Sequence, residues 1–329
     1  MPRYLQATTE RFAVAGSFTI SRGTRTHADV VTCTIRDGSF TGKGECVPYP
    51  RYGESIEGVI ADIEVMAEQI AGGLTRQDLQ QAMKPGAARN AVDCALWDLE
   101  AKMSGKSAAE QVLGQAAQPQ PLVTAYTISL ADPDTMAAKT AQNATRPLLK
   151  IKTGTADDEA RMRAVRAAAP EARIIIDANE GWNDGNIEYY LRLAAELKIS
   201  LIEQPLPAGK DAILARIDHP VLICADESVH STKDLAGLRD RYDAINIKLD
   251  KTGGLTEALV MKAEAERLGF TIMVGCMLGT SLGMAPAVLA AQGAAFADLD
   301  GPLLLAEDRE AGLVYEGSLV YPARPELWG

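Results

Sequence analysis

Three hydrophobic runs in the second half of the chain each end in an acidic residue. The acids are Asp177, Glu203 and Asp226, and they lie 26 and 23 residues apart. That spacing is about the length of one strand, one helix and two short loops, the unit that builds a parallel sheet. In a closed βα barrel every strand delivers its last residues to one face, where active sites lie. We therefore expect three carboxylates to converge at one barrel mouth.

Carboxylates that converge repel one another unless a cation lies between them. The expected ligands are oxygen atoms only, with no His or Cys among them, which indicates a hard ion over zinc. We predict one Mg²⁺ per subunit, with Mn²⁺ as the alternative, held by Asp177, Glu203 and Asp226.

Lysines flank the acids on both sides in the sequence. Lys150 and Lys152 end the hydrophobic run before them, and Lys248 follows Asp226 by 22 residues. Residues two apart in a strand share a face, so Lys150 and Lys152 point the same way. If Lys152 and Lys248 lie on opposite sides of a carbon, one removes its proton and the other returns one, which inverts the carbon. Lys150 is then an electrostatic helper near the substrate carboxylate.

The plain alternative is that the three lysines only neutralise the acids. Charges at strand ends inside a barrel mouth are costly without a function, so we favour the catalytic interpretation. Two more acids, Asp298 and Asp300, share one side of the eighth expected strand. They are either solvated loop acids or a receptor for a cation. Ser129, just past the first strand, is either a contact for a substrate peptide group or a turn hydroxyl.

Five ordered motifs carry a resemblance to a known family. They are Lys150-Ile151-Lys152, Asp177-Ala178-Asn179-Glu180-Gly181-Trp182, Glu203-Gln204-Pro205-Leu206, Ala225-Asp226-Glu227-Ser228 and Asn246-Ile247-Lys248. In order and spacing the chain resembles the enolase superfamily, in the subgroup that contains muconate cycloisomerase and the dipeptide epimerases. The resemblance covers essentially the whole chain. It implies an α/β fold, a modified TIM barrel of the (β/α)7β type with an α+β capping domain, and Lys or His bases beside Mg²⁺, a known pairing in this superfamily.

The resemblance also indicates a substrate. An Asp-x-Asp motif at the eighth strand end is similar to that of dipeptide epimerases of the L-Ala-D/L-Glu type, where it binds the α-ammonium of the substrate. Gly275-Cys276-Met277 matches these enzymes too, which makes Met277 a candidate contact. An arginine on the capping loop would pair with an acidic side chain. Arg25 is our candidate, Arg22 is the second and Arg51 the third, and the alternative is a surface arginine.

The organisation of the chain agrees with this resemblance. Alternation over residues 12–37 predicts antiparallel strands, and residues 87–102 carry a helical pattern. Eight candidate barrel strands follow, at 122–128, 148–152, 174–177, 201–203, 221–225, 244–248, 271–274 and 297–299. We predict a capping domain over 1–115, the barrel over 116–302, and a tail, 303–329, that returns to the capping domain, as the resemblance implies.

Composition excludes several other classes of protein. The net charge of −11 over 329 residues argues against nucleic-acid binding. No stretch has the roughly 18–20 apolar residues of a membrane span, and the N-terminus lacks the apolar core of a signal peptide. Five cysteines without CxxC spacing favour reduced thiols and a cytoplasmic location. The sequence leaves open whether the protein forms a homo-oligomer.

The predicted function is Mg²⁺-dependent epimerisation of the C-terminal residue of a dipeptide. Loss of the α-proton leaves an enediolate, whose charge develops where the ion is fixed. An N-acylamino acid racemase or a cycloisomerase on the same scaffold is the alternative, and a barrel that binds carboxylates without turnover is the rival from another class. The pair of lysines argues against a barrel that binds carboxylates without turnover. The family suggests a role in murein-peptide recycling.

Overall fold

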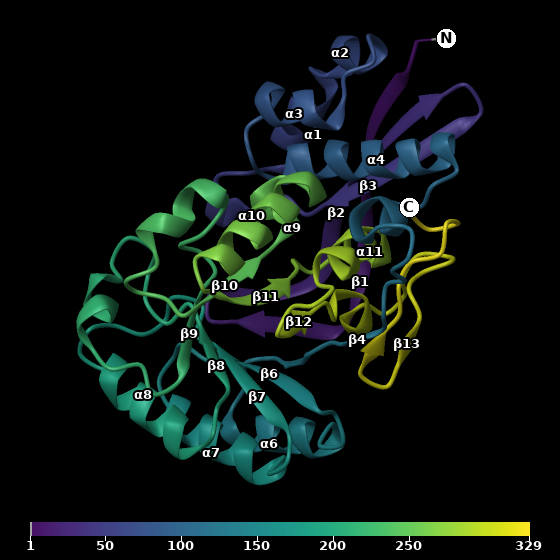
Figure 1. The fold of residues 1–329 in the computed structure, drawn as a ribbon. Helices are drawn as coiled ribbons and strands as arrows, with labels where there is room; N and C mark the ends of the chain where they lie inside the picture. The colour runs from purple at the N-terminus through teal and green to yellow at the C-terminus, as the bar shows by residue number, and fades with distance from the viewer. Residues whose placement is uncertain (1) are drawn as a thin grey trace.

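The computed structural model describes residues 2–329, which form an N-terminal antiparallel sheet with helices and an eight-stranded parallel barrel (Figure 1). In the view of Figure 1 the N-terminal elements lie above the barrel, and the C-terminal tail runs along one side. No helix within residues 2–329 combines the length and the hydropathy that crossing a membrane requires.

The N-terminal sheet is built from a long hairpin and a third strand. Strand β1 (Tyr4–Ile20) pairs with β2 (Gly23–Asp37), and β2 pairs with β3 (Phe40–Cys46), both antiparallel. Helices α1 (Ile56–Glu64), α2 (Ala67–Ala71), α3 (Arg76–Ala82), α4 (Ala87–Ser104) and α5 (Ala108–Leu113) follow. The far half of the hairpin reaches the barrel, where Val14 and Ala28 pack with Leu278 and Leu305.

Helix α4 lies directly on strand β3 because two glycines of that strand leave room for it. A Cβ atom on Gly44 would lie 2.2 Å from the carbonyl oxygen of Ala91, and one on Gly42 would lie 2.1 Å from that of Ala95. Both neighbours are backbone atoms inside a helix, so they cannot move aside cheaply. Every residue of α4 from Ala87 to Leu99 is buried. The small residues of β3 therefore fix the distance between helix and sheet.

We expect Gly44→Ala to destabilise the protein by about 3 kcal/mol, the upper end of the usual cost of overpacking, because the new methyl group meets helix backbone. Gly237→Ala is the matched control, since a Cβ there has nothing within 4 Å. Urea unfolding followed by circular dichroism measures both. Equal midpoints for the two variants would contradict the close packing of α4 on β3.

The barrel consists of eight parallel strands in sequence order around the ring. They are β5 (Tyr126–Ile128), β6 (Leu148–Lys152), β7 (Arg173–Asp177), β8 (Leu201–Glu203), β9 (Leu222–Ala225), β10 (Ala244–Ile247), β11 (Thr271–Gly275) and β12 (Phe296–Asp298). The ring closes through a parallel bridge between Thr124 and Ala297 and a hydrogen bond of 2.8 Å from the Ala125 amide to the Ala297 carbonyl.

The inside of the barrel is stacked in layers because alternate residues of a strand face the same way. One apolar residue from each strand forms a floor: Ala125, Leu148, Ile175, Leu201, Cys224, Ala244, Met273 and Phe296. A second set of residues, here called the polar layer, lies two residues further along the chain in each strand. It consists of Thr127, Lys150, Asp177, Glu203, Asp226, Asn246, Gly275 and Asp298. All eight are buried. The strands thus place charged groups directly above a hydrophobic floor.

Helices connect most neighbouring strands on the outside of the barrel. They are α6 (Pro133–Gln142), α7 (Asp158–Ala168), α8 (Ile187–Glu196), α9 (Leu249–Thr252), α10 (Leu255–Arg267) and α11 (Ser281–Ala290). After β8 and β9 the connections contain only the short 3₁₀ helices η2 (Ala212–Arg216) and η3 (Thr232–Gly237). Seven connections between eight strands give the predicted (β/α)7β architecture, and the predicted fold class is confirmed.

One predicted strand is wrong in its extent. Residues 122–128 form two strands, β4 (Leu122–Val123) and β5, because Val123 and Leu122 pair with the tail strand β14 (Leu319–Val320) outside the barrel. Strand β14 pairs in turn with β13 (Tyr315–Glu316). The end of the tail also contacts α4, where Trp328 Nε1 donates to the Cys94 carbonyl at 2.9 Å. The domain boundaries at 115 and 302 stay a prediction.

Candidate active site

A buried network of lysines and carboxylates fills the polar layer. Lys150 Nζ lies 2.6 Å from Glu203 Oε2, 2.7 Å from Asp298 Oδ2 and 3.1 Å from Asp177 Oδ2. It therefore reaches acids on three different strands from the middle of the barrel. Lys152 Nζ lies 2.6 Å from Asp177 Oδ2, which gives this carboxylate two ammonium partners.

The third candidate acid has its own pair of lysines. Lys248 Nζ lies 2.7 Å from Asp226 Oδ2, and Lys251 Nζ lies 2.5 Å from Asp226 Oδ1. Lys251 also donates to the carbonyl oxygens of Asp226 at 2.7 Å and Asn246 at 3.0 Å. The Asn246 side chain donates to Glu203 Oε1 at 2.7 Å, so it orients this acid. The sequence thus predicted seven charged groups of this network, the three lysines and the four acids, and missed Lys251.

The network shifts the ionisation of its members in a consistent direction. Burial raises the pKa of Asp226, but Lys248 and Lys251 outweigh burial and hold that pKa well below its ordinary range. Burial lowers the pKa of Lys248, but the carboxylates of Asp226 and Glu203 outweigh burial and hold it well above its ordinary range. This direction is opposite to the one a general base needs. A cation bound to those acids would offset their effect on Lys248.

The donor set fits a hard divalent ion in chemistry and in burial. Asp177, Glu203 and Asp226 come from adjacent strands, present only oxygen atoms and are at most 2% exposed. Asn179 Oδ1 and Glu227 Oε2, in the loops after β7 and β9, are buried oxygens without a hydrogen-bond partner in residues 2–329. As the side chains stand, no three Asp, Glu, His or Cys groups in that range surround a common point. The ammonium groups lie among the acids, so ion binding requires them to shift.

Lys152 and Lys248 lie on opposite walls of the barrel. Strand β6 carries Lys152, and Lys248 directly follows β10. Strands β7, β8 and β9, which carry the three acids, separate them on one side, and β11, β12 and β5 separate them on the other. In an eight-stranded ring this is the largest separation that two strands can have. The two ammonium groups therefore approach the mouth from opposite directions.

Asp298 and Asp300 lie across the barrel from Glu203, since β12 is four strands from β8. Asp298 Oδ1 is buried and has no hydrogen-bond partner in residues 2–329, while Oδ2 already holds the Lys150 ammonium. Asp300 Oδ2 accepts from the Thr127 amide at 2.6 Å. Burial, together with the charge of Asp298, raises the pKa of Asp300 to about 7. Two buried carboxylates whose charges influence each other are disposed to share a cation.

A cavity of about 200 Å³ lies at this barrel mouth, between the barrel and the capping hairpin. Its lining includes Lys152, Asp226 and Lys248 from the barrel and Arg25 from the hairpin, together with Met277. Other lining residues that the sequence did not single out come from the capping region: Phe18, Ile20, Tyr49 and Tyr52. Ser129 is not part of this lining.

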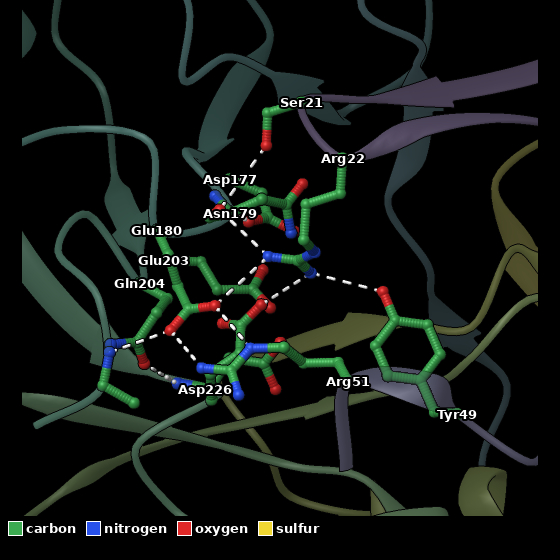
Figure 2. A network of polar contacts seen from close by, with 12 residues as sticks. Ser21, Arg22, Tyr49, Arg51, Asp177, Asn179, Glu180, Glu203, Gln204 and Asp226 are labelled. Carbon is green, nitrogen blue, oxygen red and sulfur yellow. Dashed lines mark hydrogen bonds and ion pairs between the residues drawn. The ribbon is translucent and has the colours of Figure 1, made fainter. Parts of the chain in front are cut away.

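Of the three candidate arginines, two are already paired with acids of the barrel loops (Figure 2). Arg51 holds Glu180 through two hydrogen bonds of 2.7 and 2.9 Å. Arg22 donates to Glu227 Oε1 at 2.8 Å and to the Asn179 carbonyl at 2.9 Å. Arg25 lies over the Tyr49 ring, 5.2 Å from its centroid, and has no carboxylate partner in residues 2–329. Its guanidinium is therefore the one placed to receive an acid from outside the chain.

The eight-stranded barrel, its capping sheet and the order of acids and lysines on its strands define an enolase-type enzyme. Comparison with known families agrees. Residues 5–114 match the mandelate racemase/muconate lactonizing enzyme N-terminal domain, and residues 135–313 match the enolase C-terminal domain-like family. The chain belongs to the mandelate racemase/muconate lactonizing enzyme family. The predicted resemblance and the predicted enzyme class, an isomerase, are confirmed.

Two curated relatives carry different activities. The chain is 46% identical over 300 residues to the L-Ala-D/L-Glu epimerase of Escherichia coli, with 91% of this chain and 93% of that protein covered. It is 41% identical over 302 residues to an N-acetyl-D-glutamate racemase of a Pseudoalteromonas species, with 91% and 95% covered. Both act on a glutamate derivative.

Solved structures show the same architecture. An enolase family member from Agrobacterium tumefaciens with homology to dipeptide epimerases, bound to sodium and L-Ala-L-Glu, is 92% identical over the whole of both chains, with a TM-score of 0.98. A dipeptide epimerase from Cytophaga hutchinsonii, complexed with Mg and D-Ala-L-Val, is 27% identical, with a TM-score of 0.90 and 98% and 94% of the chains covered.

Proposed function

We propose that the protein is a dipeptide epimerase that inverts the α-carbon of the C-terminal residue of L-Ala-D/L-Glu or a similar dipeptide. One observation carries the proposal, the crossed arrangement of the mouth. Lys152 and Lys248 lie on opposite walls of the barrel. The other pair of walls carries the acids around Glu203 opposite Asp298 and Asp300. A zwitterionic dipeptide has a carboxylate for the first group of acids, through an ion, and an ammonium for the second.

Each residue of the barrel mouth has a separate role in the proposed reaction. A dipeptide that spans the mouth from β8 to β12 places its α-carbon between the two lysines. One lysine removes the α-proton, which leaves an enediolate on the substrate, and the opposite lysine donates a proton to the other face. For the other epimer the two lysines exchange roles. Lys150, on the barrel axis, adds positive charge beside the substrate carboxylate.

The cation is part of the proposal. We infer one Mg²⁺ per subunit, held by Asp177, Glu203 and Asp226, with Mn²⁺ as a substitute. When bound, the ion supplies positive charge next to the oxygens on which negative charge develops. The Mg complex of the related dipeptide epimerase and the oxygen-only donor set support this choice. A cytoplasmic location and a role in murein-peptide recycling belong to the same proposal.

Substrate selection is assigned to two groups, the buried acids at the end of β12 and residues that line the mouth cavity. Asp298 and Asp300 would receive the α-ammonium, and Arg25, with Met277 beside it in the lining, would receive the side-chain carboxylate of glutamate. The bound L-Ala-L-Glu of the 92% identical relative supports the dipeptide. The racemase relative supports the second candidate function, racemisation of an N-acylated glutamate, which has no ammonium. The two buried acids at the end of β12 favour the dipeptide.

We expect N-acetylation of L-Ala-L-Glu to lower kcat/KM by about a hundredfold or more. The acetylated substrate lacks the cation, so the buried Asp298 Oδ1 stays without a partner and Asp300 gains no positive charge beside it. Each lost charge-assisted hydrogen bond is worth roughly 1.5–3 kcal/mol. Asp298→Asn should narrow the difference between the two substrates. Coupled assays measure kcat/KM for both substrates in the wild type and in Asp298→Asn. Equal turnover of the two by the wild type would remove the dipeptide function and favour the N-acylamino acid racemase.

A further inference from the structure

Arg22 ties the tip of the capping hairpin to two separate barrel loops. The residue lies in the turn between β1 and β2. Its Nη1 atom donates to the Asn179 carbonyl at 2.9 Å (Figure 2). Its Nη2 atom donates to Glu227 Oε1 at 2.8 Å. One guanidinium therefore joins the loop after β7 to the loop after β9. The planar fork of arginine makes this bridge possible, whereas a lysine has one point of charge.

Both loops begin at a candidate ion ligand. Asn179 is two residues past Asp177, and Glu227 directly follows Asp226. The backbone amide of Asn179 donates to Asp177 Oδ1 at 2.9 Å. The turn that Arg22 contacts therefore also holds the Asp177 carboxylate. The Glu227 side chain is only 1% exposed, and Arg22 is its ion-pair partner. Each ligand is thus one or two residues away from an atom that Arg22 fixes.

The turn after β7 needs such support because its backbone is strained. Asn179 and Glu180 have φ values of 45° and 66°, a left-handed conformation that residues with a side chain seldom adopt. Two such residues in succession persist only where the surroundings hold them. The Glu180 backbone amide donates to the Gln204 carbonyl at 2.9 Å. Arg22 of the hairpin holds the Asn179 carbonyl, and Arg51, in the short 3₁₀ helix after β3, holds the Glu180 carboxylate. If the hairpin lifts, the turn loses the contact that Arg22 makes with the Asn179 carbonyl.

We propose that Arg22 is a positioning residue that couples the capping hairpin to the divalent-ion site, so that hairpin docking and ion binding favour each other even without substrate. The inference rests on the proposed ion site. When the hairpin is docked, Arg22 sets the turns that orient Asp177 and Asp226. By linkage, the ion must then stabilise the docked hairpin by the same factor. Arg25, three residues along, is brought over the cavity by the same docking.

The test is the affinity of the substrate-free protein for Mn²⁺, measured by EPR of the free ion. Arg22→Met should weaken binding by about 10- to 100-fold, the usual loss when a group that supports an ion ligand is removed. Arg22→Lys should restore part of it. Arg11→Met is the matched control, because Arg11 pairs with Asp29 on the exposed part of the same hairpin. It should bind Mn²⁺ like the wild type.

A second readout follows the hairpin itself. In the wild type, Mn²⁺ alone should slow hydrogen exchange of the backbone amides of residues 18–25, and in Arg22→Met it should not. The coupling would be contradicted if Arg22→Met bound Mn²⁺ as tightly as the wild type, or if Mn²⁺ did not change the hydrogen exchange of the wild-type hairpin. Either result would leave the proposed ion site intact. A wild type that binds no Mn²⁺ would overturn the proposed ion site and the coupling together.

Discussion

Asp226→Asn is expected to lower kcat/KM for L-Ala-L-Glu by roughly 10³-fold at low Mg²⁺, because a bound ion supplies several kcal/mol of charge stabilisation in such reactions. The amide keeps the shape of the side chain but removes one of the three negative charges that attract the ion. Activity should recover in part as Mg²⁺ is raised. For the wild type, EDTA should abolish activity, and added Mg²⁺ or Mn²⁺ should restore it.

The control must separate loss of the ion from loss of the fold, since Asp226 also pairs with Lys248 and Lys251. Asp93→Asn removes an equally buried carboxylate, which accepts from Gln80 and from the Thr256 amide away from the barrel mouth. That variant should lose stability and keep its dependence on Mg²⁺. Full activity of the wild type in EDTA, or of Asp226→Asn at low Mg²⁺, would contradict the proposed requirement for the ion.

Lys152→Ala and Lys248→Ala should each lower the rate of epimerisation by about 10²–10⁴-fold, the usual contribution of a positioned acid or base. One loss is as severe as the other because inversion needs a proton donor on one face and an acceptor on the opposite face. Lys102→Ala is the control, since Lys102 pairs with the buried Asp98 away from the mouth. Chiral chromatography of the dipeptide measures the rates. Near wild-type epimerisation by either active-site variant would contradict the assignment of two bases.

Much of the mouth could be predicted because parallel strands end at one face and their residues alternate. That regularity fixes the polar layer from Lys150 on β6 to Asp298 on β12 once the hydrophobic runs are located. It also explains why Lys152 and Lys248 lie on opposite walls, since the order of strands in the sequence is their order around the ring. The acids, the lysines and the fold class follow from local patterns.

Three other features were not predicted from the sequence. Lys251 reaches Asp226 from the first turn of α9, three residues past Lys248, because helical spacing brings it back over the strand end. Arg22 meets Asn179 and Glu227 only because the hairpin docks on the barrel. The break of residues 122–128 into two strands reflects pairing with the tail, almost 200 residues away. Packing between distant segments decides the last two of these features.

The claim of two bases on opposite faces is tested most directly by exchange of the glutamate α-proton in D₂O. Each epimer, L-Ala-L-Glu and L-Ala-D-Glu, is incubated with the wild type, Lys152→Ala and Lys248→Ala, and deuterium is followed by mass spectrometry and proton NMR. The wild type should label both epimers while it interconverts them. Each variant should label at most one epimer, a different one for each lysine, without inversion. Labelling of both epimers by a single variant would contradict the account, because one remaining lysine would then serve both faces.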